Sequence, residues 1–342
     1  MRSVPFLTAM TVLAAATLMS LSLGAMSVPF AKVLQALLSG LGLASAPEPQ
    51  QQALVLGLRL PRAILGAAAG GALASAGAAL QALFRNPLAD PGVIGVSNGA
   101  ALAAAAVLVL GTPTTASVAS STSLLLPLIA FAGGVGTTWL VYRGATFSGH
   151  TSARHLLLTG IAINALAGAA TGMLVFLAND AQLRSLTFWM LGSLGNASWA
   201  TVATAVPWML VAILLLPRLS AGLDALLLGE AETSHLGFDP VRLKRQIVLL
   251  SALAVGSSVA VSGVIGFVGL MVPHFVRLWL GPQHQRLLPI SAALGGALLL
   301  FADVGARTVA APAELPIGIL TALLGGPFLL EMLRREQTVE EH

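Results

Sequence analysis

Long apolar stretches recur along the whole chain and are separated by short polar breaks. Each stretch is near or beyond the ~18 residues that a helix needs to cross a hydrocarbon core. Unbroken stretches favour helices over the short alternating segments of a membrane β-barrel. We therefore predict an all-α integral membrane protein, a single transmembrane domain over residues 1–342, with about ten transmembrane helices. The predicted spans are 5–26, 58–83, 95–112, 122–142, 153–178, 200–217, 246–262, 264–280, 287–304 and 316–333.

The first span follows a short segment that contains Arg2, so a cleaved signal peptide is an alternative for this part of the chain. Residues 23–25, Leu-Gly-Ala, would be its small-residue cleavage site. A retained first helix is favoured because many more spans follow.

Composition supports a lipid environment. Hydrophobic residues make up 56% of the chain and charged residues 9%, whereas soluble domains carry roughly 25% charged residues. The 36 glycines suit close packing of transmembrane helices. The net charge of +4 comes from basic residues scattered between apolar spans, which argues against nucleic acid as a partner. There is no cysteine, so disulfides and thiolate metal sites are excluded.

The distribution of basic residues predicts the orientation. With a cytoplasmic N-terminus and ten spans, most of the 17 lysines and arginines fall on the cytoplasmic side, and both termini are cytoplasmic. The outward exceptions, which need a reason of their own, are Lys32, Arg59, Arg62, Arg184 and Arg307.

Two pairs of similar segments suggest an internal repeat. Residues 58–64 resemble residues 241–247, and residues 92–96 resemble residues 263–267, in the same order. Two halves of about five helices each would be inverted relative to one another, as in many transporters, with the pathway between them.

The sequence shows no motif for chemistry. The lysines Lys32 and Lys244 lack the glycine context of a phosphate-binding loop, and no nucleophile with a base or pair of mid-span carboxylates suggests catalysis. The six histidines fall mainly at predicted helix ends, so we predict no metal site. The chain is expected to be a transport subunit and not an enzyme.

Five distinctive motifs follow one another along the chain. They are Leu58-Arg59-Leu60-Pro61-Arg62, the segment Arg85-Asn86-Pro87-Leu88-Ala89-Asp90-Pro91, Phe188-Trp189-Met190-Leu191-Gly192-Ser193-Leu194, Gly263 to His274 followed by Arg277, and Glu314-Leu315-Pro316-Ile317-Gly318-Ile319-Leu320-Thr321. In these motifs, and over nearly the whole chain, the sequence resembles a known family, the FecCD-type permeases of type II, binding-protein-dependent ABC importers, which take up cobalamin, ferric siderophores and haem.

The resemblance implies a homodimer with two cytoplasmic ABC ATPase subunits and a periplasmic substrate-binding protein, in the bilayer of the bacterial inner membrane. It implies no cofactor in this chain, because ATP and Mg²⁺ would belong to the ATPase. Arg59, Arg62 and Arg307 match positions that receive acidic residues of the binding protein. We expect Arg59 and Arg62 on one helical face at the outer surface, where guanidinium groups would bind carboxylates. The alternative is that these arginines only anchor helix ends at the lipid headgroups.

The resemblance also assigns the polar segment 220–241 to a cytoplasmic helix pair that fits the ATPase. A short helix bounded by Gly229 and Gly237 is expected, with a solvated linker as the alternative. The predicted coupling residues are Leu228, Gly229, Glu230, Thr233, Leu236, Gly237 and Phe238.

The span 153–178 is expected, by the same resemblance, to line the translocation pathway, with Asn164 as the best polar candidate. Small residues for helix packing are the alternative for most of its glycines. The predicted pathway and gate residues are Asn86, Leu88, Thr151, Ser152, Thr159, Asn164, Gly168, Thr171 and Gly172.

The expected function is ATP-driven import of haem or a related iron chelate. A ferric siderophore and cobalamin are the alternatives within this class. An ion-coupled secondary transporter is the alternative from another class, but it usually needs mid-span carboxylates.

Overall fold

The computed structural model describes residues 4–24, 26–45, 47–111, 124–147 and 150–340. Arg2, Ala25, His342 and the predicted span residues 112 and 122–123 lie outside the described residues. Within the described part, seven helices are long and apolar enough to cross a membrane. The shorter apolar segments are Phe30–Gly40, Val96–Leu110, Val268–Leu280 and, within α16, Ile317–Met332, and the last three lie in the bundle and bring the number to ten. The ten are α1 (Val4–Ser22), α4 (Leu60–Phe84), α5 (Val96–Leu110), α7 (Leu125–Ala145), α8 (Ala153–Leu177), α10 (Trp199–Leu215), α13 (Pro240–Ser262), α14 (Val268–Leu280), α15 (His284–Thr308) and α16 (Ile317–Glu340).

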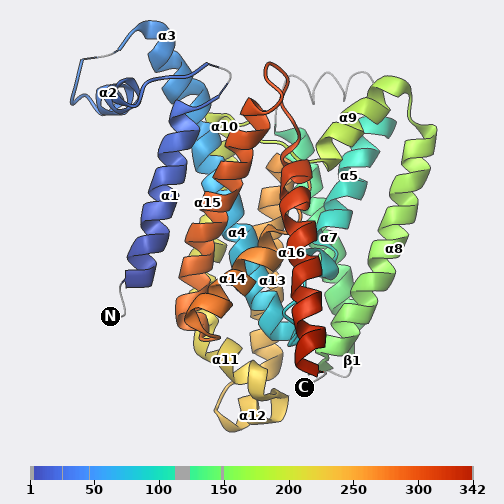
Figure 1. Cartoon of the computed structure of the whole chain (residues 1–342). Coiled ribbons are helices and arrows are strands. Elements are labelled where there is room, and N and C mark those ends of the chain that lie inside the picture. The colour runs from blue at the N-terminus through green and yellow to red at the C-terminus, as the bar shows by residue number, and fades with distance from the viewer. Residues whose placement is uncertain (1–3, 25, 46, 112–123, 148–149, 341–342) are drawn as a thin grey trace.

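Short elements gather at the two ends of this bundle (Figure 1). One end, called here the α3 end, carries α2 (Phe30–Gly40), α3 (Pro49–Gln52) and α9 (Asp180–Met190). The opposite end, the α12 end, carries α11 (Ser220–Leu228) and α12 (Glu230–His235), together with the start of α1 and the end of α16. The remaining short elements are the π-helix η1 (Ala53–Arg59), the 3-10 helices η2 (Pro91–Ile94) and η3 (Leu216–Leu219), and the two-stranded hairpin β1 (Thr146–Phe147) and β2 (His150–Thr151).

Helix α4 lies at the centre and α8 at the edge of the bundle. In the most apolar stretch of the span that contains α4, 89% of the residues are buried, whereas in that of α8 only 17% are. Small residues allow α4 to be so enclosed: an added Cβ at Gly70 would overlap the backbone of Gly295 on α15, and one at Gly77 would overlap the backbone of Gly269 on α14. Close backbone approach of this kind is how transmembrane helices pack without a hydrophobic driving force.

The inverted repeat predicted from sequence is visible in the direction of matched helices. Helix α4, which begins with the first copy of the repeated arginine segment, starts at the α3 end, and α13, which begins with the second copy, starts at the α12 end (Figure 1). The two helices therefore run in opposite directions through the centre of the molecule.

Several predicted boundaries need correction. The span predicted over 264–280 begins as a helix only at Val268, because a turn with Gly263 and Phe267 at positive φ precedes it. The break predicted over 27–56 contains α2 and α3, and the stretch between α8 and α10 contains α9. Helix α9 starts with a capping box, in which Asn179 and Gln182 satisfy one another's backbone amides.

Candidate functional site

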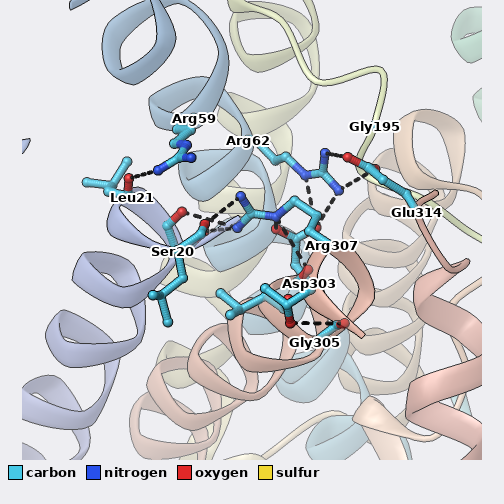
Figure 2. A network of polar contacts seen from close by, with 12 residues as sticks. Ser20, Leu21, Arg59, Arg62, Gly195, Asp303, Gly305, Arg307 and Glu314 are labelled. Carbon is cyan, nitrogen blue, oxygen red and sulfur yellow. Dashed lines mark hydrogen bonds and ion pairs between the residues drawn. The ribbon is translucent and has the colours of Figure 1, made fainter. Parts of the chain in front are cut away.

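An arginine and carboxylate cluster lies at the α3 end of α4 and α15 (Figure 2). Arg62 of α4 donates through Nε to Asp303 of α15 at 2.9 Å, and its Nη1 and Nη2 bind the two oxygens of Glu314 at 3.0 and 2.9 Å. The bidentate geometry makes this one of the stronger kinds of charged contact. The cluster therefore ties the start of α4 to α15 and to the loop that precedes α16.

The carboxylate of Asp303 forms ion pairs with two guanidinium groups. Its carboxylate lies 2.8 Å from Nη2 of Arg62 and 2.9 Å from Nε of Arg307, and it is 1% exposed. Arg307 also donates to the carbonyls of Ser20 and Leu23 at 3.1 Å. A buried charge is costly unless it is paired and hydrogen-bonded, and each member of this group is.

Arg59 contacts a different part of the chain. Its guanidinium donates to the carbonyls of Leu21 at 2.7 Å and Ser22 at 2.9 Å, and it also contacts the carbonyl of Met26. The last turn of a helix leaves carbonyls without partners inside that helix, so Arg59 and Arg307 together complete the end of α1.

The expectation that Arg59 and Arg62 lie on one exposed face is wrong. Arg59 and Arg307 are 5% and 6% exposed, and Arg59 points to α1 while Arg62 points to α15. The π-helix η1 ends at Arg59, and its i→i+5 bonding shifts the side-chain register relative to the following α-helix. Their role in docking a binding protein stays a prediction.

Glu314 is the member of the cluster that water reaches, since its side chain is 44% exposed. The hydrogen bond from Arg62 lowers the pKa of the Glu314 carboxyl, although partial burial opposes this. The contact therefore contributes fully to stability at pH values above the ordinary glutamate pKa. This contribution is lost as the pH falls through the lowered pKa of Glu314. Beside Glu314 lies a cavity of about 610 Å³, whose polar lining includes Ser193, Asn196 and Ser262.

At the α12 end, the segment predicted to couple to an ATPase forms two short helices joined at Gly229. Gly229 has φ 131° and ψ 159°, a conformation open to glycine, and Gly237 ends α12 at φ 86°. Thr233 is fully buried, whereas Leu228 and Leu236 are 68% and 58% exposed. Phe238 is exposed as well and Glu230 is half-exposed. Apolar side chains exposed at the end of a membrane bundle are typical of a protein interaction surface.

The predicted gate residues lie in two turns. Asn86 accepts a hydrogen bond from the amide of Leu88 at 2.8 Å, which closes the turn after α4. Thr151 of β2 is buried, and its hydroxyl lies 2.8 Å from that of Thr146 across the hairpin, while Ser152 follows as the N-cap of α8. The structure brings Thr151 to Glu230 of the coupling segment, through Lys244.

The predicted pathway residues of α8 include two that make contacts within the chain and two that border open space. Thr159 packs against Gly144 of α7, and the buried Thr171 donates to the carbonyl of Ala167 in its own helix. Gly168 and Gly172 have open space where a Cβ would stand, so packing within this chain does not require glycine at either position.

Asn164 does not face the open side of α8. Its Nδ2 donates to the carbonyl of Gly92 in η2 at 3.1 Å, and its Oδ1 is buried without a hydrogen-bond partner among the described residues. The amide therefore holds η2, which follows the Asn86 turn, against α8. Its predicted part in lining the pathway is not supported by this orientation.

Sequence reasoning missed Asp303, which lies inside the predicted span 287–304. A carboxylate four residues before Arg307 on one helix is a signal for an ion pair within that helix. It also missed the pair that His284 makes with Asp224, 2.6 Å apart, between α15 and α11. Among the described residues, no three histidine, aspartate or glutamate side chains converge as metal ligands.

The structure is thus a bundle of apolar helices long enough to cross a membrane, with a charged cluster at one end and exposed apolar side chains at the other. The chain belongs to the FecCD transport family, whose model matches residues 12–335. It is 45% identical over 284 residues to the hemin transport system permease protein HmuU of Yersinia pestis, covering 82% of this chain and 83% of that protein. It is 42% identical over 287 residues to the cobalamin import system permease protein BtuC of Halobacterium salinarum, covering 84% of this chain and 75% of that protein.

A solved structure of an ABC transporter described as of metal-chelate type, in an inward-facing conformation, has the same fold. It superposes with a TM-score of 0.83 at 30% identity and covers 96% of this chain and 98% of its own. The predicted family and fold class are thereby confirmed. This chain is a multi-pass permease subunit of an ABC importer, a transport component that works with ATPase and substrate-binding partners and is not an enzyme.

Proposed function

We propose that this subunit pairs with a second copy of itself in the bacterial inner membrane and passes haem from a periplasmic binding protein to the cytoplasm. In this arrangement the α3 end faces the periplasm, and the α12 end, with both termini, faces the cytoplasm. The observation that carries the proposal is that two unlike surfaces lie at opposite ends of one bundle. An arginine and carboxylate cluster lies at the α3 end (Figure 2), and exposed apolar side chains lie at the α12 end.

The cluster suits a binding protein, because a carboxylate of that protein would take the place of the exposed Glu314 on Arg62. The α12 surface suits an ATPase groove, because Leu228 and Leu236 offer apolar contacts that a membrane does not cover at the end of the bundle. ATP and Mg²⁺ belong to that partner.

The exposed face of α8 supports the second copy and the pathway. Ile161, Ala165, Gly168 and Gly172 follow one another at helical spacing and are all exposed. The small residues among them, Ala165, Gly168 and Gly172, let another helix approach closely or leave room for a bulky solute. In a homodimer this face would border the translocation pathway.

Replacing Gly172 with leucine tests that assignment. We expect Gly172→Leu to lower transport about tenfold without changing the apparent melting temperature, because nothing in this chain occupies the space beside Gly172. Gly136→Leu on α7, another exposed glycine with open space around it, is the matched control and should transport normally. Equal transport by the two variants would remove α8 from the pathway.

Haem is the proposed substrate because the hemin permease is 45% identical to this chain, with a cobalamin permease close to it at 42%. A ferric siderophore is the remaining alternative. The test is to reconstitute the complete complex in proteoliposomes and to supply the binding protein loaded separately with hemin, a ferric siderophore or cobalamin. We expect ATP-dependent accumulation of hemin, and accumulation of another chelate in its place would overturn the choice of haem.

A further inference from the structure

Lys244 is a buried cation with partners in two distant segments. It lies near the start of α13, is 1% exposed, and its ammonium lies 2.7 Å from Oε2 of Glu230. The ammonium also donates to the backbone carbonyl of Thr151. Removing an ammonium group from water is costly without such partners, so both contacts constrain where these segments sit.

The start of α13, which carries Lys244, is firmly held. Asp239 caps the helix by accepting from the amides of Val241 at 2.9 Å and Arg242 at 3.2 Å. The next apolar residue, Leu243, is buried and packs closely on Gly222 of α11. The backbone at the start of α13 is therefore held, and the long Lys244 side chain extends from it to the other two segments.

Glu230 lies where one of these segments can turn. It is the first residue of α12 and follows Gly229, whose positive φ separates α12 from α11. Helix α11 packs on α4 and α15, and its Gly222 contacts Leu243 of α13, so rotation about Gly229 would move α12 relative to α11 and α13. Such a rotation would change the distance between the Glu230 carboxylate and the Lys244 ammonium, which is now 2.7 Å.

Thr151 lies in the other segment, the β1–β2 hairpin that joins α7 to α8. The hairpin is closed by the register in which Thr146 pairs with Thr151 and by the contact of their hydroxyl groups at 2.8 Å. It leads directly into α8, the helix whose exposed face is the proposed pathway. A shift of Thr151 therefore shifts the start of α8.

We propose that Lys244 is the positioning residue that couples α12 to the β1–β2 hairpin, so that a displacement of α12 by the ATPase moves the hairpin. The inference rests on the proposed function, in which α12 meets the ATPase, and on the prediction from sequence that Thr151 and Ser152 belong to a cytoplasmic gate. When Glu230 moves, the buried ammonium loses its counter-charge and must follow it or hold the Thr151 carbonyl alone. The contacts of Lys244 with Glu230 and Thr151 would thus transmit a displacement of α12 to the start of α8.

Substrate transported per ATP hydrolysed, measured in proteoliposomes that contain the complete complex, tests this coupling. We expect Lys244→Met to assemble with the ATPase and hydrolyse ATP while this ratio falls about tenfold, within the usual range of a coupling free energy between sites. Lys244→Arg keeps a cation that can reach both partners and should restore most of the ratio. Arg245→Met, one position along on the exposed side of α13, is the matched control and should behave as the original protein.

A second variant keeps the test decisive if Lys244→Met does not fold. Glu230→Gln should lower the same ratio, whereas Glu232→Gln, also exposed on α12, should not. Wild-type ratios in both Lys244→Met and Glu230→Gln, or in Glu230→Gln alone where Lys244→Met does not fold, would overturn the coupling inference. If the unmodified complex itself shows no ATP-dependent transport, the proposed function has failed instead.

Discussion

Replacing Arg62 with methionine should weaken docking of the binding protein by about a hundredfold, because truncating one partner of a buried, hydrogen-bonded charge pair costs roughly 2–5 kcal/mol. Arg62 is the arginine of the cluster that binds the exposed Glu314, so it is the one that a carboxylate arriving from outside can reach. The measurement is a binding titration of the protein partner on the permease held in nanodiscs. Association with the ATPase should be unchanged.

Two further variants separate docking from a general loss of structure. Arg184→Met, on the exposed side of α9 at the same end, should leave binding unaltered. Glu314→Gln should tighten binding several-fold, because it removes the internal carboxylate that competes for Arg62. Undiminished binding by Arg62→Met, or weaker binding by Glu314→Gln, would show that the cluster serves only to hold α4, α15 and the loop before α16 together.

Asp303→Asn should be the most damaging single change for the stability of the subunit. It leaves Arg62 and Arg307 without the buried charge that neutralises both, and breaking a buried pair in this way costs about 3–5 kcal/mol. The expected result is a markedly lower apparent melting temperature of the purified subunit in detergent. Asp180→Asn, exposed at the start of α9, is the matched control and should melt as the original protein does.

The same change should also release the end of α1, because Arg307 holds Ser20 and Leu23 while it is oriented by Asp303. Protease cleavage between α1 and α2 is a convenient measure of that release. An unchanged melting temperature together with unchanged cleavage would contradict the assignment of Asp303 as the central charge of the cluster.

Much of the fold follows from the sequence because the bilayer allows few solutions. Spans of nearly pure apolar composition, with basic residues at their ends, predict helices and their orientation without knowledge of any contact. The helix break at Gly229 could also be predicted from the sequence, since a glycine between two helical patterns favours a backbone conformation that other residues avoid.

The contacts within the sites could not be predicted from the sequence, since the residues that contact one another lie far apart along the chain. Arg62 and Asp303 are separated by 241 positions, and nothing near either residue indicates the other. Lys244 appears in the sequence as one of three basic residues at a helix start with Arg242 and Arg245, yet the structure buries it and exposes the other two. Asn164 was predicted from sequence as the best polar candidate for the pathway, but its amide donates to the carbonyl of Gly92, a contact that depends on how α8 packs on η2.

The central claim about this permease is that it has no energy source of its own. The direct measurement is uptake into proteoliposomes that contain the subunit alone or with its ATPase, with loaded binding protein outside and either ATP or an ion gradient supplied. We predict uptake only when ATP, the ATPase and the binding protein are all present. Accumulation of substrate by the subunit alone, driven by a proton or sodium gradient, would contradict it.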